Sequence, residues 1–196
     1  EVRKRARVLV LIDVSGSMGE VVGSAGGQSK LDLAKTAASD ALADFAPDDE
    51  VGVWAFTSTD QPAPDGIYTE LAPIAPLGPN LDRIRGEIAK LVPLNGTPLY
   101  AVARHAVATM SAAADPDRIN AVVLLTDGRN EYPPDTDVDG LIRSIQVSES
   151  IPGAVRVFSI AYGQDADLDV LRRISEASRA AAYDATDPTS LERIFT

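Results

Sequence analysis

The sequence contains no cysteine and only one histidine, and both shortages narrow the chemistry open to it. Without cysteine the chain forms no disulfide, has no thiolate nucleophile and cannot hold zinc through sulfur. With His105 as the single histidine, a site that needs two imidazoles is excluded as well. The helical pattern around His105 favours an ordinary place on a helix face. Thiol chemistry and metal sites that need two histidines are therefore excluded.

Basic residues are also scarce. The chain has 18 Lys and Arg against 29 Asp and Glu, a net charge of −11 that repels a phosphate backbone and argues against nucleic-acid binding. The basic residues 3–7, RKRAR, are interpreted as a solvated lead-in to the first strand or as a linker.

Long hydrophobic runs are absent too, since no stretch approaches the roughly 18 apolar residues of a membrane helix. The chain begins at Glu1 rather than Met, so we expect it to be a piece of a longer protein. A membrane attachment would then come only from an anchor or a domain outside these residues.

What the sequence does contain is an alternation of apolar runs and helical patterns. Continuous apolar runs are typical of strands in a parallel sheet that helices cover on both faces. The expected strands are residues 7–13, 50–57, 120–127, 154–162 and 181–184. Residues 67–77 contain Pro73 and Pro76, which suit only an edge strand, so this segment is expected to form a hairpin with residues 50–57. The predicted helices span residues 31–45, 80–91, 99–113, 139–150, 167–177 and 188–195.

These elements predict one α/β domain over residues 1–196, with a core at about 7–195. We expect a doubly wound (Rossmann-like), mostly parallel sheet with one antiparallel edge strand and helices on both faces. Ser29 and Asp32 match a capping box at the start of the first helix. No repeat or composition shift marks a second domain, and we expect a monomer.

Two of the expected strands end in a carboxylate. Asp13 closes VLVLID and Asp127 closes AVVLLTD, so the two side chains converge if these strands are neighbours where the strand order reverses. Ser15 and Ser17 follow the first strand at alternate positions, and Thr97 opens the helix that leads back to the second.

All five of these side chains offer hard oxygen ligands, and two of them are anionic. A small divalent cation takes about six oxygens and usually keeps several waters, so Mg²⁺ fits this set, with Mn²⁺ or Ca²⁺ as alternatives. The sequence therefore predicts a metal site made of Asp13, Ser15, Ser17, Thr97 and Asp127.

Three segments carry a family resemblance. DVSGSM (13–18), NGTPLY (95–100) and LLTDGRN (124–130) resemble, in order, the three parts of the metal-ion-dependent adhesion site of von Willebrand factor type A (VWA) domains. The likeness extends over about residues 7–195. Two departures lie beside the site: Ala101 follows Tyr100 where many relatives have Asp, and the loop 19–28 is longer than in the shortest forms.

The resemblance implies roles for the five residues. Ser15, Ser17 and Thr97 would contact the metal directly, while Asp13 and Asp127 would act largely through bound water. A Glu or Asp carboxylate of a protein or peptide partner would then become the last metal ligand.

A finer resemblance concerns location. Residues 29–58, 117–130 and 155–178 are similar to the C-terminal A domain of actinobacterial surface lipoproteins that carry a solute-binding-like domain. This likeness implies an extracellular or cell-envelope protein that is membrane-anchored at full length.

The sequence favours a binding module over an enzyme. Phosphoaspartate hydrolases need a second acid two residues after the first-strand Asp, where this chain has Ser15, and the sequence places no Lys near either strand end as a phosphate partner. No Ser-His-Asp set is evident either. The alternative is a cytoplasmic A domain that recruits partners to an ATPase-driven, chelatase-like machine, and a Mg²⁺-dependent phosphohydrolase is a weaker one.

Asp135, Asp137 and Asp139 alternate as in a calcium loop but lack its Gly and Glu, so we expect a solvated loop there.

Overall fold

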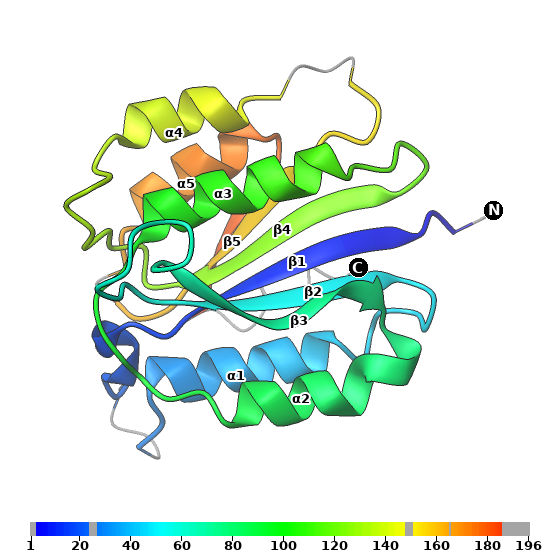
Figure 1. Ribbon diagram of the computed structural model, residues 1–196. Helices are drawn as coiled ribbons and strands as arrows, with labels where there is room; N and C mark the ends of the chain where they lie inside the picture. The colour runs from blue at the N-terminus through cyan, green and yellow to red at the C-terminus, as the bar shows by residue number, and fades with distance from the viewer. Residues whose placement is uncertain (1–2, 24–26, 148–150, 165, 186–196) are drawn as a thin grey trace.

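A computed structural model describes residues 3–23, 27–147, 151–164 and 166–185 of the chain. These residues form a six-stranded sheet in the order β3-β2-β1-β4-β5-β6 (Figure 1). β2 and β3 are antiparallel, and all other neighbouring strands are parallel. The strands are β1 (Ala6–Asp13), β2 (Glu50–Phe56), β3 (Tyr68–Pro76), β4 (Ile119–Thr126), β5 (Arg156–Ala161) and β6 (Ala182–Asp184). The predicted sheet with its one antiparallel edge strand is confirmed.

Helices cover both faces of the sheet (Figure 1). α1 (Lys30–Ala41) and α2 (Leu81–Ala89) lie on one face, and α3 (Leu99–Ala112), α4 (Val138–Ile145) and α5 (Leu168–Ala177) lie on the other. Two short 3-10 turns, η1 (Gly16–Gly19) and η2 (Gly78–Asn80), follow β1 and β3. The helix predicted over residues 188–195 lies outside the described residues. No helix in the described part of the chain is long and apolar enough to cross a membrane.

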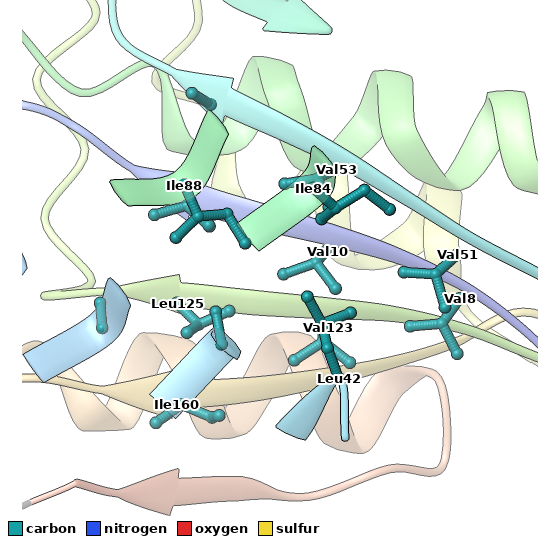
Figure 2. Close-up of a cluster of buried hydrophobic side chains, with 14 of the residues drawn as sticks. Val8, Val10, Leu42, Val51, Val53, Ile84, Ile88, Val123, Leu125 and Ile160 are labelled. Carbon is teal, nitrogen blue, oxygen red and sulfur yellow. The ribbon is translucent and has the colours of Figure 1, made fainter. Parts of the chain in front are cut away.

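The continuous apolar runs of the strands reflect burial on both sides. Val8, Val10 and Ile12 of β1 belong to a core cluster with residues of α1 and α2, some of which Figure 2 labels. Leu9 and Leu11 belong to a second cluster with α3 and α5. Since side chains of a strand alternate between the faces of a sheet, a strand buried on both faces shows no polar alternation.

Helix α1 begins as predicted and ends early. The Ser29 hydroxyl accepts a hydrogen bond from the Asp32 N–H and the Asp32 carboxylate accepts one from the Ser29 N–H, which completes the capping box. The helix ends at Ala41 rather than at residue 45, although Phe45 still packs against the core. Pro47 follows closely and disfavours a helical conformation in the residue before it.

Candidate metal centre

The candidate site lies where the strand order reverses between the two central strands. β1 pairs with β4, and Ile12 is aligned with Leu125, so Asp13 and Asp127 stand at adjacent strand ends. Both are buried. Ligands of open α/β sheets bind outside the carboxyl ends of the strands at such a reversal. The predicted neighbourhood of the two carboxylate-bearing strands is confirmed.

The segment after β1 folds back over Asp13. The Ser15 N–H donates to Asp13 Oδ1 (2.8 Å), and the hydroxyls of Ser15 and Ser17 lie 3.1 Å apart. Ser17 lies in the η1 turn, which brings its hydroxyl back beside that of Ser15. Alternate spacing of the serines thus places two hydroxyl oxygens next to one carboxylate.

The loop that carries Thr97 is held between the two strand ends. The Gly16 N–H donates to the carbonyl of Asn95 (2.7 Å), and the Glu131 N–H donates to the carbonyl of Thr97 (2.8 Å). The first bond fastens this loop to the segment after β1, and the second fastens it to the segment after β4. All five residues predicted from the sequence are therefore gathered at one edge of the sheet.

The hydroxyl of Thr97 has no hydrogen-bond partner. Among the described residues only two buried side-chain polar atoms lack one, Thr97 Oγ1 and the hydroxyl of Tyr162. A buried hydroxyl without a partner is costly, and most buried polar groups in proteins are paired. An unpartnered oxygen in a loop that is hydrogen-bonded to the segments following both buried carboxylates fits a site that binds a cation.

The electrostatics of Asp13 fit a cation as well. The pKa of the Asp13 carboxyl is raised to about 6, mainly by burial and to a smaller extent by the nearby charge of Asp127. Hydrogen bonds from Ser15 and from the Thr126 hydroxyl (2.6 Å to Asp13 Oδ2) favour the ionised form and act in the opposite direction. A positive charge in the site would stabilise both carboxylates.

Sequence reasoning missed Lys30, which lies beside the end of β4 although it is not placed as a phosphate partner. The ammonium of Lys30 is 3.5 Å from Asp127 Oδ2 and 2.7 Å from Glu20 Oε2. Lys30 is the first residue of α1 and is only 5% exposed. The position of Lys30 could have indicated this role in the sequence. A cation in the first turn of a helix interacts unfavourably with the helix dipole, so a lysine there suggests a nearby negative charge.

The three alternating aspartates have structural partners, and Asp135 and Asp137 lie in a loop as expected, whereas Asp139 lies in the first turn of α4. Asp135 pairs with Arg104, the Asp137 side chain caps α4 by accepting from the Gly140 N–H, and Asp139 pairs with Arg173. Within the described ranges, no group of three or more His, Cys, Asp or Glu side chains is placed to hold a metal. Ser15, Ser17 and Thr97 add hydroxyl oxygens to the two carboxylates of the candidate site, and oxygen is the ligand that a small divalent cation prefers.

The fold agrees with a comparison to known families. The model of the von Willebrand factor type A domain matches residues 8–196, so the chain belongs to that family. No curated protein matches the sequence.

Solved structures show the same fold at low sequence identity. A von Willebrand factor type A protein from Catenulispora acidiphila superposes with a TM-score of 0.73 at 22% identity, over 97% of this chain and 41% of that one. Proximal thread matrix protein 1 from the mussel byssus, "with zinc occupied MIDAS motif", superposes with a TM-score of 0.65 at 19% identity, over 97% of this chain and 46% of that one. Manganese-loaded TRAP protein from Plasmodium vivax superposes with a TM-score of 0.67 at 16% identity, over 98% of this chain and 73% of that one. The chain thus spans less than half the length of the first two.

Proposed function

We propose that this domain binds one divalent cation, Mg²⁺ in the first place, and uses it to bind a protein or peptide that offers a Glu or Asp side chain. The proposed metal residues are Asp13, Ser15, Ser17, Thr97 and Asp127. The observation that carries the proposal is the buried, unpartnered hydroxyl of Thr97. It belongs to the loop that is hydrogen-bonded to the segments following the two buried strand-end carboxylates. Mn²⁺ and Ca²⁺ offer similar ligand preferences and are alternatives. The solved relatives with zinc and manganese support a divalent cation of this kind.

In this proposal Ser15, Ser17 and Thr97 bind the cation through neutral hydroxyls, while the two carboxylates hold the loops and bound waters. A cation held by few anionic ligands keeps the positive charge that attracts a partner's carboxylate. The acidic character of the whole chain makes this local charge necessary, because a net charge of −11 opposes an acidic partner at long range.

The surface beside the site indicates what else the partner offers. Within the described part of the chain five large hydrophobic side chains are exposed, and three of them belong to the two loops of the site: Val21, Val92 and Leu94. Leu94 is 55% exposed, and its N–H donates to the carbonyl of Val14 (2.7 Å), directly after Asp13. We infer a partner whose acidic residue has an aliphatic or aromatic neighbour, because exposed apolar side chains at a site mark a contact surface.

A hydrolase function is disfavoured by the surroundings of Asp13. Both of its carboxylate oxygens accept hydrogen bonds, Oδ1 from the Ser15 N–H and Oδ2 from the Thr126 hydroxyl. The ammonium of Lys30 is buried against Glu20 and Asp127 and is not presented to a phosphate. The cytoplasmic, chelatase-like alternative differs in setting rather than in site chemistry. We propose the extracellular or cell-envelope setting, with this chain as one monomeric domain of a longer, membrane-anchored bacterial protein.

Thr97→Val should separate metal binding from stability. Removing the unpartnered hydroxyl is expected to leave the free energy of unfolding unchanged or to raise it by about 1 kcal/mol, while Mg²⁺ affinity falls at least about ten-fold for the lost ligand. Urea unfolding and titration calorimetry measure the two effects.

Thr126→Val is the matched control. The Thr126 hydroxyl donates to Asp13 and accepts from the Gly128 N–H (3.0 Å), so the same change should destabilise the fold by about 1–3 kcal/mol. A Thr97→Val protein that is equally destabilised and keeps its Mg²⁺ affinity would contradict the proposed role of the Thr97 hydroxyl.

Selection of peptides from a random display library in Mg²⁺ should recover sequences that share an Asp or Glu beside an apolar residue. Their binding should disappear in EDTA, and changing the shared acid to its amide should weaken it several-fold. Moderate salt should speed association, because it screens the repulsion between two acidic molecules.

Two substitutions in the domain test where the selected peptides bind. Leu94→Asp should weaken binding of the selected peptides. Ile119→Asp changes another exposed side chain, at the start of β4 on the opposite edge of the sheet, and should not weaken it. Peptides that bind equally in EDTA, or that share no acidic residue, would overturn the metal-bridged mechanism.

A further inference from the structure

Lys30 occupies an unusual position for a lysine. Its ammonium lies in a buried place between Asp127 Oδ2 (3.5 Å) and Glu20 Oε2 (2.7 Å), and its side chain is 7% exposed. Burying an ammonium is costly unless charged partners accompany it. The partners here are one residue of the proposed metal site and one exposed glutamate.

The aliphatic stem of Lys30 passes close to Gly163, which follows β5. A Cβ added at Gly163 would stand 2.6 Å from Lys30 Cε, so a larger residue there would make the end of the lysine side chain shift. Gly163 also has a φ of +90°, which favours glycine for a second reason. Glycine at position 163 therefore leaves space for the end of the long side chain that brings a positive charge to Asp127.

The charges of the site explain what this ammonium does. Asp13 and Asp127 are both buried, and Lys30 compensates one of the two negative charges. The carboxylate of Glu20 is 61% exposed, so water screens most of its charge. A divalent cation then meets one uncompensated buried negative charge and leaves the site with a net positive charge after binding. Without Lys30, the same cation would be neutralised by the two carboxylates.

We propose that Lys30 is a built-in counter-ion of Asp127 that weakens cation binding and keeps the bound cation positive enough to take up an external carboxylate. This role rests on the proposed function, because it concerns the same metal site. It makes Lys30 a positioning and charge-setting residue and not a metal ligand. Metal affinity and carboxylate affinity should therefore change in opposite directions when its charge is removed.

The test measures metal alone first. Lys30→Met keeps the aliphatic stem and removes the charge. In titration calorimetry it is expected to bind Mg²⁺ and Mn²⁺ at least about ten-fold more tightly than the wild type, because a unit positive charge a few ångströms from a divalent cation lowers its affinity by a factor of that order. Lys30→Arg keeps the charge and should stay close to the wild type. Lys4→Met removes the same charge from an exposed residue at the opposite edge of the sheet and should change the affinity less than about two-fold.

The second measurement uses acetate as the carboxylate probe. Acetate that displaces water from bound Mn²⁺ lowers the water-proton relaxation of the Mn²⁺-loaded domain, and Lys30→Met should need several-fold more acetate than the wild type. Lys30→Gln serves as a second neutral variant, and circular dichroism verifies that each variant is folded.

The outcomes separate the two proposals. Folded Lys30→Met and Lys30→Gln proteins with wild-type or weaker cation affinity would overturn the role of Lys30 and leave the metal site intact. Equal tightening in Lys4→Met would also overturn it, because the effect would then be one of net charge. A wild type and Lys30 variants that all fail to bind Mg²⁺ and Mn²⁺ would remove the metal site itself, and the role of Lys30 with it.

Discussion

Asp13→Ala should lower the affinity of the domain for Mg²⁺ by about ten- to hundred-fold, because it removes a charged group that organises the metal ligands. The substitution removes the acceptor of the Ser15 N–H and of the Thr126 hydroxyl, so both groups would be left buried without their partner. The loop that carries Ser15 and Ser17 loses its anchor in the same step. Titration calorimetry with Mg²⁺, and with Mn²⁺ as a second probe, measures the loss.

Two variants make this result specific. Asp13→Asn keeps the size of the side chain and one carbonyl oxygen but removes the charge, so it should weaken cation binding while disturbing the fold less than alanine does. Asp117→Ala removes an acid that lies outside the site, in the turn before β4, and should leave the affinity unchanged. Equal heats of binding for the wild type and Asp13→Ala would show that the cation binds elsewhere.

Leu124→Ala should have the largest effect on stability, lowering the free energy of unfolding by about 3–4 kcal/mol because it opens a cavity in a closely packed core. Leu124 is fully buried in the cluster that β1 and β4 share with α3 and α5. Trp54, the only tryptophan, is buried in β2 and stacks on Tyr68 with ring centroids 4.0 Å apart, so its fluorescence follows unfolding in urea.

Leu94→Ala is the control for Leu124→Ala. It shortens an exposed side chain and should change the free energy of unfolding by no more than about 0.5 kcal/mol.

Removal of metal should leave the fold intact. EDTA should leave the circular dichroism of the wild type unchanged at room temperature, because two apolar clusters on either side of the sheet supply the burial that stabilises a domain of this size. A loss of secondary structure on adding EDTA would instead make the site a structural one.

The sequence predicted the elements well where burial alone decides them. β1 and β4 are continuous apolar runs because both of their faces are covered, and that requirement is visible in each strand separately. The end of α1 was predicted less well. Its apolar period continues to Phe45, which does contact the core, but from a turn, and a hydrophobic period cannot distinguish a helix from a turn that buries the same side chain.

For the candidate site, the sequence indicated which residues carry oxygen ligands but not what surrounds them. Asp13, Ser15 and Ser17 lie within five positions of each other, so their grouping could be recognised in one short segment. Lys30 and Thr126 escaped notice because their roles depend on side-chain contacts between distant segments. Thr126 meets Asp13 across the sheet, and Lys30 reaches Asp127 from the start of α1.

The central claim is that the strand-end cluster binds a divalent cation, and crystals of the domain grown with Mn²⁺ test it most directly. The account predicts one strong peak in the anomalous difference map, between the hydroxyl oxygens of Ser15, Ser17 and Thr97 and next to the carboxylates of Asp13 and Asp127. The same map from Asp13→Ala crystals should lack that peak. A wild-type map with no peak at this edge of the sheet, or with its strongest peak elsewhere on the domain, would contradict the account.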